Sequence, residues 1–297
     1  MRYVSPEEDC GRWEGFPFRD GDIVVSTRSK SGTTWMQMIC ALLVFQSPDL
    51  PVPLGDLSPW LDRTTSPRNE VVAMLERQQH RRIVKTHTPL DGIPIDSRAT
   101  YIVVARHPLD MAVSLYHQED NIDRARLRQL TGQPEPEVPE APRRPLHEWL
   151  LGWIERDLPP AEEMDGLPGV MWHLTGAWDR RREPNIVLVH YDDLLADLGR
   201  EMRGLARRLG IDVRAHRWPV LVAAARFESM RAEAAALLPD RNGVLKDPLA
   251  FFRRGTSGAG AEVLSPQELA RYYKRVASMA RADLVSWLHR RQAEGSP

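Results

Sequence analysis

The sequence predicts an α/β fold in which a doubly wound, mainly parallel sheet carries helices on both faces. Four short runs rich in β-branched residues alternate with helical segments along the 297 residues, as in sheets whose parallel strands are joined by helices. Polar and basic residues directly follow these runs, where open sheets of this class bind their ligands. The chain shows no repeat and no linker, so we expect a single domain over residues 1–297.

The first strand and the helix after it enclose a loop of small and polar residues. Residues 23–25 are Ile-Val-Val, which is typical of a buried strand, and residues 33–45 are apolar nearly all round, as in a central helix. Such a strand, loop and helix favour an anion, because backbone amides and the helix dipole point at one place. The loop residues that add a cation, hydroxyl groups or backbone freedom are Lys30, Ser31, Gly32, Thr33 and Thr34.

The position of Lys30 distinguishes this loop from the P-loop of nucleoside triphosphatases. In that P-loop the lysine directly follows the second glycine and precedes a serine or threonine that holds Mg²⁺. Here Lys30 comes two residues before Gly32, and the GxxxxGK[ST] pattern does not occur in the sequence. The loop therefore predicts phosphate binding without the metal site of an ATPase. An ordinary turn between strand and helix is the alternative for this motif taken alone.

The second predicted strand ends in two candidate catalytic residues. Residues 82–86 form this strand, and Pro89 stops regular structure soon afterwards. Lys85 and His87 therefore lie at the carboxyl end of a strand, where an open sheet places its ligands. A structural histidine is the alternative for His87.

The third predicted strand covers residues 100–105 and is followed by Arg106. A helix begins at Pro108 or Leu109, because proline suits the first helical turn. Ser114 follows on this helix, so a cation and a hydroxyl group are expected at the same edge of the sheet.

The fourth predicted strand covers residues 185–189 and is followed by Tyr191. Asp193 is expected to cap a helix that reaches Leu209. Further helices are expected over residues 70–79, 146–157, 170–182 and 221–238, and after a capping box at residues 265–268.

Three segments lack clear periodicity. Residues 1–21 are expected to form an irregular arm whose aromatic residues pack on the domain. Residues 121–145 are charged and contain five prolines, which predicts a long and mobile loop on the substrate side. Residues 251–260 form a basic loop rich in glycine.

The composition argues against nucleic-acid and membrane proteins. The 40 basic and 41 acidic residues nearly cancel, so no nucleic-acid partner is expected. No apolar run approaches the length of a membrane span, and the first residues lack an apolar signal segment. We therefore expect a cytoplasmic protein without stable membrane insertion.

Lysine is rare in this chain. Of the 40 basic residues only four are lysines, and two of these are Lys30 and Lys85. An ammonium group is a compact charge that can lose its proton or follow a reacting atom, which a guanidinium group cannot do. The lysines at the two strand ends are therefore candidates for catalysis, with chance as the alternative.

Together these motifs resemble the cytosolic-type sulfotransferases, which use 3′-phosphoadenosine 5′-phosphosulfate (PAPS). The matching segments are the loop at residues 26–35, Lys85-Thr86-His87, residues 101–116, Tyr191, and Arg253-Arg254-Gly255 in place of an Arg-Lys-Gly loop. They stand in the family's order over residues 22–260, which makes the resemblance specific. It implies a P-loop-like fold and a PAPS-dependent enzyme.

The resemblance also implies roles for individual residues. The loop after the first strand would bind the 5′-phosphosulfate, Arg106 and Ser114 would bind the 3′-phosphate, and His87 would be the catalytic base. Trp35 and Phe227 are candidates for stacking on adenine, with core packing as the alternative for Trp35. The full set of expected donor-binding residues is Lys30, Ser31, Gly32, Thr33, Thr34, Trp35, Arg106, Ser114, Tyr191, Phe227, Arg253, Arg254 and Gly255.

Sulfuryl transfer suits these residues chemically. It passes through a loose transition state, so catalysis depends on positioning and on charge stabilisation. A sulfuryl group carries less negative charge than a phosphoryl group, so lysines can replace Mg²⁺ and no metal is expected. Lys30 would stabilise the bridging oxygen and Lys85 the sulfuryl oxygens. His87, with an ordinary pKa of about 6.5, would accept the proton of the acceptor hydroxyl group.

The acceptor is expected to be a largely apolar small molecule or a glycolipid. The Ser58-Pro-Trp-Leu61 motif and the apolar region around it are similar to bacterial members of the family, some of which sulfate glycolipids. Two segments depart from the family pattern: Arg28-Ser29 stands where Tyr-Pro is common, and residues 258–261 replace a Gly-Asp-Trp-Lys run. No oligomeric state is predicted.

Two other functions stay open from the residues alone. A P-loop kinase would need a carboxylate for Mg²⁺ at a strand end, which Asp192 or Asp193 could supply, but the position of Lys30 argues against it. A catalytically silent nucleotide-binding protein would keep Arg106 and Ser114 but would not need His87 with two lysines.

Overall fold

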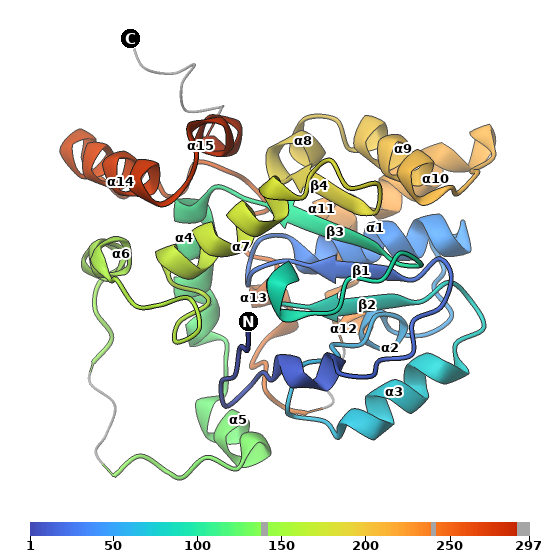
Figure 1. Cartoon of the computed structure of the whole chain (residues 1–297), viewed down its shortest axis with the longest axis horizontal. Helices are drawn as coiled ribbons and strands as arrows, with labels where there is room; N and C mark the ends of the chain where they lie inside the picture. Colours follow the sequence, from blue (N-terminus) through green and yellow to red (C-terminus); the bar gives the residue numbers. More distant parts are fainter. Residues whose placement is uncertain (138–141, 239–241, 290–297) are drawn as a thin grey trace.

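The computed structural model describes residues 1–137, 142–238 and 242–289. Four parallel strands form one sheet in the order β2–β1–β3–β4 (Figure 1). They are β1 (Ile23–Ser26), β2 (Ile83–Thr86), β3 (Thr100–Ala105) and β4 (Ile186–His190). Each boundary lies within one residue of the prediction, and the parallel sheet confirms the α/β class.

The strand order reverses next to β1. The chain leaves β1 for β2 on one side and then crosses to β3 on the other side. Ser26, the last residue of β1, pairs with Thr86 of β2 and with Val103 of β3. Such a reversal opens a crevice beyond the carboxyl ends of the strands, so the segments that follow β1, β2 and β3 meet there.

Two hydrophobic cores cover the two faces of the sheet. Along β3, Tyr101 and Val103 belong to one core and Ile102 and Val104 to the other, as expected for alternating side chains. The first core contains the amino-terminal arm, α3 (Arg68–Arg77), α4 (Pro108–Asp120), α6 (Leu146–Glu155), α7 (Leu167–Asp179), α14 (Pro266–Met279) and α15 (Ala282–His289). The second contains α1 (Thr33–Phe45), α2 (Leu54–Leu57), α8 (Tyr191–Ala196), α9 (Leu198–Leu209), α10 (Trp218–Ala224), α11 (Phe227–Ala232) and α12 (Ala234–Leu237).

The remaining elements are short. They are α5 (Arg124–Thr131), α13 (Pro248–Phe251) and the 3-10 turns η1 (Cys10–Trp13), η2 (Leu90–Gly92) and η3 (Ala215–Arg217). Within the described ranges, no helix combines the length and the apolar character needed to cross a membrane.

Part of the expected loop at residues 121–145 is helical. Asp123 accepts a hydrogen bond from the Arg126 amide (2.9 Å) and caps α5, and Gly132 ends the helix with φ +66°. The prediction of an irregular segment was therefore wrong for α5, because the cap and the glycine outweigh the weak apolar pattern. Residues 138–141 of this segment lie outside the described residues, and its mobility stays a prediction.

The expected single helix over residues 221–238 is broken into α10, α11 and α12. The first break follows Ala225, whose carbonyl oxygen accepts a hydrogen bond from the Trp35 indole (2.7 Å). This break turns Phe227 toward the loop at Gly255, where a Cβ atom on the glycine would lie 2.4 Å from the ring. A tertiary contact therefore overrides the helical propensity of the alanines.

The expected cap at Asp193 was also wrong. Helix α8 begins earlier, at Tyr191, and its cap is His190, whose Nδ1 accepts a hydrogen bond from the Asp192 amide (3.1 Å). A second helix, α9, then begins with Asp197 as its cap.

The amino-terminal arm packs on the first core as expected. Trp13, Phe16 and Phe18 are buried and contact one another, with the Trp13 and Phe16 ring centroids 5.3 Å apart. The Asp9 amide donates a hydrogen bond to the Asp62 carbonyl oxygen (2.8 Å). The arm therefore lies along the segment that precedes α3.

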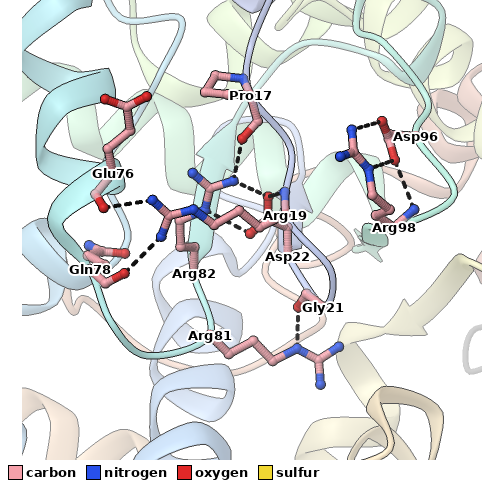
Figure 2. A network of polar contacts seen from close by, with 10 residues as sticks. All are labelled: Pro17, Arg19, Gly21, Asp22, Glu76, Gln78, Arg81, Arg82, Asp96 and Arg98. Atoms are coloured by element: carbon pink, nitrogen blue, oxygen red, sulfur yellow. Dashed lines mark hydrogen bonds and ion pairs between the residues drawn. The ribbon is translucent and has the colours of Figure 1, made fainter.

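Arginine side chains form hydrogen bonds and an ion pair at the amino edge of the sheet, where strands β1 and β2 begin (Figure 2). Arg82 pairs with Asp22, and both side chains are only 1% exposed. Arg82 also donates a hydrogen bond to the Pro17 carbonyl oxygen (2.8 Å). Arg19 donates to the carbonyl oxygens of Glu76 (2.7 Å) and Gln78 (3.0 Å). These bonds fasten the arm and the end of α3 to the start of β1 and β2.

Candidate functional site

A cavity of about 810 Å³ lies beyond the carboxyl ends of the strands. Every site residue predicted from the sequence lines it except Ser31, which is buried and donates its amide to the Arg28 carbonyl oxygen (3.2 Å). The predicted residues in its wall are Lys30, Gly32, Thr33, Thr34, Trp35, Lys85, His87, Arg106, Ser114, Tyr191, Phe227, Arg253, Arg254 and Gly255. Residues far apart in the sequence thus meet at one site.

The loop after β1 is held in a tight conformation by Gly32 and Tyr191. Gly32 caps α1 with φ +100°, and a Cβ atom there would lie 3.0 Å from the Tyr191 ring. Lys30 also has a positive φ, +60°, which is uncommon for a residue other than glycine. The first amides of α1 have no partner within the helix and are available to an anion.

The Lys30 ammonium group lies inside the cavity next to neutral groups. Its Nζ donates a hydrogen bond to Gln118 Oε1 (3.0 Å) and lies 3.9 Å from the centroid of the Phe251 ring. Burial, together with the positive charges of Arg106 and Lys85, lowers the pKa of Lys30 to about 7. A bound anion would reverse this effect, because an opposite charge favours the protonated lysine.

Lys85 and His87 both contact Trp60. The Lys85 Nζ is 3.9 Å from the centroid of the Trp60 ring, and the His87 ring contacts the same indole edge to face, with centroids 4.5 Å apart. Trp60 is held there because the backbone of residues 59–61 pairs with Lys85 as a short extension of the sheet. Burial lowers the pKa of Lys85 to about 7, and the charge of Arg63 adds to this effect.

His87 has a defined tautomer. Its Nδ1 is hydrogen bonded to the Thr27 carbonyl oxygen, and a carbonyl oxygen can only accept, so Nδ1 carries the proton and Nε2 is the free basic nitrogen. Burial lowers the pKa of His87 well below its usual range, with Lys85 and Arg28 adding to the effect. The ring is therefore neutral at pH 7. The Thr27 hydroxyl group bonds to that of Thr33, so Thr27 connects His87 to the start of α1.

Arg28 occupies a position where the family commonly has tyrosine. Its side chain is 3% exposed and pairs with Asp165 at 2.7 Å. It also donates a hydrogen bond to the His87 carbonyl oxygen. Arg28 therefore ties the segment before α7 to His87, and its positive charge disfavours protonation of the His87 ring.

Arg106 joins the loop after β1 to the basic loop near the carboxyl terminus. Its two terminal nitrogens donate to the carbonyl oxygens of Lys30 (2.9 Å) and Thr256 (3.0 Å). Asp110 holds the same basic loop, since its carboxylate accepts hydrogen bonds from the amides of Gly258 and Gly260 (both 2.8 Å). The sequence did not indicate this role of Asp110. The Nε atoms of Arg106 and of Arg253 are buried and have no partner in the described part of the chain.

The other expected donor-binding residues lie around this basic loop. Trp35 contacts the Tyr191 ring edge to face, with centroids 5.2 Å apart. The Arg106 Cζ atom lies 4.5 Å from the centroid of the Tyr191 ring. Arg254 has a half-exposed side chain that pairs with Glu262 at 3.1 Å. Of the two arginines in the loop, Arg253 is therefore the one without an ion-pair partner in the described residues.

The cavity wall also contains residues that were not among the predicted site residues. Glu8, Trp60 and Gln118 belong to this group. Gln118 is four residues after Ser114 on α4, a spacing that places both on one face and could have identified it. Glu8 carries no such signal, because the fold brings it to the site from the amino-terminal arm. Trp60 belongs to the Ser58-Pro-Trp-Leu61 motif, which indicated an apolar or glycolipid acceptor, but it was not among the predicted site residues.

In the described ranges, no group of three or more His, Cys, Asp or Glu side chains is arranged to hold a metal ion. The kinase alternative would place Mg²⁺ at Asp192 or Asp193, but Asp192 instead accepts a hydrogen bond from the Ser257 hydroxyl group.

Known proteins with similar sequences and structures are consistent with this site. The family model of the sulfotransferase domain matches residues 20–282. Proteins named glycolipid sulfotransferase from Mycobacterium bovis and Mycobacterium tuberculosis are 40% identical over 97% of this chain and 93% of their own length. The crystal structure of mouse sulfotransferase SULT7A1 complexed with PAP has a TM-score of 0.71 at 20% identity, covering 96% of this chain and 93% of that chain.

Proposed function

Because the chain belongs to the sulfotransferase family, as its sequence predicted, we propose that it transfers the sulfuryl group of PAPS to a hydroxyl group of a glycolipid or similar amphiphile. The family match and the 40% identical relatives confirm the prediction of a PAPS-dependent sulfotransferase. The identity of the acceptor and the roles of individual residues are proposals.

The observation that carries the mechanism is the convergence of Lys30, Lys85 and His87 on one cavity. The two lysines have no ion pair among the described residues, and the histidine is neutral with a free Nε2. Sulfuryl transfer needs fixed positive charge where negative charge develops, together with a base for the hydroxyl proton. These three side chains supply both.

The residues around the phosphate loop fit an anionic adenosine donor. The free amides at the start of α1 would hold the 5′-phosphate, with Thr34 beside them. The buried Nε donors of Arg106 and Arg253 fit the 3′-phosphate, which Ser114 would also contact. Trp35 and Phe227 line the same cavity and are positioned as candidates for contact with adenine.

The two lysines would act at different atoms of the transferring group. Lys30, on the phosphate loop, would stabilise the oxygen that stays with the departing nucleotide. Lys85, beside His87, would stabilise the sulfuryl oxygens. Because Lys30 is held by Gln118 rather than by a carboxylate, it can move toward that oxygen without breaking an ion pair.

The acceptor part of the cavity suits a molecule with both polar and apolar portions. Apolar side chains from α4, α5 and α6 line it, and polar side chains from the arm and the segment after Trp60 line it as well. The residues concerned are Leu115, Leu127, Trp149 and Trp153 on the apolar side, and Glu8, Arg63, Thr65 and Ser66 on the polar side. The mycobacterial relatives named glycolipid sulfotransferase support this choice of acceptor.

A donor comparison tests the proposal. The purified protein is incubated with octyl glucoside and either PAPS or ATP, each with MgCl₂ or with EDTA, and products are identified by mass spectrometry. We expect sulfated glucoside from PAPS under both conditions and no phosphorylated product from ATP. Turnover that requires ATP and Mg²⁺, or loss of PAPS turnover in EDTA, would contradict the proposal.

A further inference from the structure

Glu8 belongs to the amino-terminal arm but lies beside the catalytic residues. Its backbone forms a bridge with Arg63, and Asp9 and Glu7 pair with Asp62 and Thr64 on either side. This segment directly follows Trp60, whose backbone pairs with Lys85. The Glu8–Arg63 and Trp60–Lys85 bridges therefore connect Glu8 to the carboxyl end of β2, where Lys85 and His87 lie.

One carboxyl oxygen of Glu8 is buried without a partner. The residue is 8% exposed, and its Oε2 has no hydrogen-bond partner in the described part of the chain, although the residue lines the cavity. An unsatisfied buried polar group costs stability, so such a group in a cavity wall indicates a partner that arrives with a ligand.

Among the described residues, none of the nearby charged groups forms an ion pair with Glu8. Arg28 pairs with Asp165, and the Asp62 carboxylate accepts hydrogen bonds from the hydroxyl groups of Thr86 and Thr88. Lys85 lies against the Trp60 ring. Glu8 therefore has no competing ion pair with these groups, and its free oxygen stays available.

The environment keeps the Glu8 carboxyl group protonated near neutral pH. Burial raises its pKa to about 8; Asp62 and Asp165 act in the same direction, while Arg28 and Lys85 oppose them. A neutral carboxyl group has one O–H donor and acceptor oxygens. It can therefore donate to one hydroxyl group and accept from another, as two adjacent hydroxyl groups of a sugar require.

We propose that Glu8 binds hydroxyl groups of the acceptor next to the one that reacts at His87, and thereby selects acceptors with a sugar head group over simple alcohols. The inference rests on the proposed function, because it assumes that the acceptor occupies this part of the cavity. The neighbouring polar wall residues Arg63, Thr65 and Ser66 fit the same polyhydroxylated group.

The test compares Glu8→Leu and Glu8→Gln with the wild type on two acceptors, octyl glucoside and 1-octanol. The two acceptors share an alkyl chain and differ in the sugar. We expect Glu8→Leu to lower kcat/KM for octyl glucoside about ten- to a hundredfold, the loss typical of one buried hydrogen-bonded group. The value for 1-octanol should change less than about twofold. Glu8→Gln, which keeps a donor and an acceptor, should lose less on the glucoside.

Two further measurements exclude a merely structural role. Glu14, in the same arm, has an 82% exposed side chain and does not line the cavity, so Glu14→Leu is the matched control and should change neither acceptor. The Tm of Glu8→Leu should stay equal or rise, because an unsatisfied buried group is replaced by an apolar one. Its affinity for 3′,5′-diphosphoadenosine, the desulfated donor, should match that of the wild type.

Several results would overturn the inference. These are an unchanged kcat/KM on octyl glucoside, an equal loss on both acceptors, or a lowered Tm with weakened nucleotide binding. If the wild type transfers sulfate to neither acceptor, the proposed function fails, and Glu8 is then judged by calorimetric binding of octyl glucoside to the protein saturated with 3′,5′-diphosphoadenosine. Absence of binding, or equal binding by wild type and Glu8→Leu, would then contradict the role of Glu8.

Discussion

At the amino edge of the sheet Arg82 is paired with Asp22, whereas at the carboxyl edge Lys30 and Lys85 face a cavity without an ion pair among the described residues. The first pair is almost fully buried and also bonded to the backbone. Among the described residues, Lys30 contacts the Gln118 amide oxygen and the Phe251 ring, and Lys85 contacts the Trp60 ring. A positive charge is thus paired with a carboxylate at the amino ends of the strands, whereas the positive charges at their carboxyl ends have no ion-pair partner among the described residues.

This difference has an energetic meaning. A buried charge is tolerated where a partner and hydrogen bonds compensate its desolvation, and removing one partner is then costly. An uncompensated cation instead shifts its pKa, as both lysines do, to about 7. The amino edge therefore contributes to stability, and the carboxyl edge is prepared for an anion at some cost in stability. Four predictions test this comparison.

The largest effect is expected for His87→Ala at the carboxyl edge. Turnover should fall by about 10²–10⁴-fold, the usual contribution of a general base, while the affinity for 3′,5′-diphosphoadenosine changes little. Steady-state kinetics and calorimetry measure the two quantities. His147, which is half-exposed and pairs with Glu268, provides the control His147→Ala, which should be nearly silent. A His87→Ala variant that keeps most of its turnover would make His87 a structural residue.

The reverse pattern is expected for Asp22→Asn at the amino edge. Removing one partner of a buried ion pair should destabilise the protein by about 3–5 kcal/mol, while the turnover of the folded protein stays near that of the wild type. Urea unfolding and kinetics below the transition measure these effects. The control is Asp96→Asn, whose partner Arg98 is half-exposed, and it should change stability far less. Equal stability of both variants would show that the buried pair is not what holds this edge.

Lys30→Arg tests whether the carboxyl edge needs an ammonium group or only a positive charge. A guanidinium group cannot follow a single oxygen whose charge grows in the transition state. The activation barrier should therefore rise by about 2.7–4 kcal/mol, so that turnover falls roughly 10²–10³-fold. The affinity for the donor should stay nearly unchanged. Lys246, which donates to the Asp120 carbonyl oxygen at the surface, provides the control Lys246→Arg. Near-native turnover of Lys30→Arg would mean that the rarity of lysine in this chain was chance.

The smallest effect is a proton uptake when nucleotide binds. The free lysines have a pKa of about 7, and a bound anion should raise it, so the complex holds more protons than the free protein. Binding at pH 7 should take up about half a proton per lysine, and affinity should fall as pH rises above 7 and level off below it.

Calorimetry in two buffers with different ionisation enthalpies measures this uptake. Glu8→Gln serves as the control, because Glu8 titrates in the same range but is expected to contact the acceptor. Release of protons on binding, or an affinity that stays constant above pH 7, would contradict the conclusion that Lys30 and Lys85 are available to a bound anion.

Features that depend on neighbouring residues could be predicted from the sequence alone. Strand positions followed from short apolar runs, and the capping box at Ser265 and Glu268 is present as predicted. Pro108 begins α4 as predicted. The catalytic candidates were identified because Lys30, Lys85 and His87 directly follow strands, and the carboxyl ends of parallel strands meet at one edge. These signals are local, so no tertiary information was needed to find them.

Which distant residues complete the site depends on how the folded chain packs. Arg28 meets Asp165 across 137 positions, and Trp35 meets Ala225 across 190, a contact that accompanies the break after α10. Glu8 reaches the cavity because the arm pairs with residues 62–64. No periodicity or spacing encodes such contacts, because they depend on how the arm and the loops pack over the sheet. The open lysines and the unpaired Glu8 were therefore visible only once the surroundings of each charge were known.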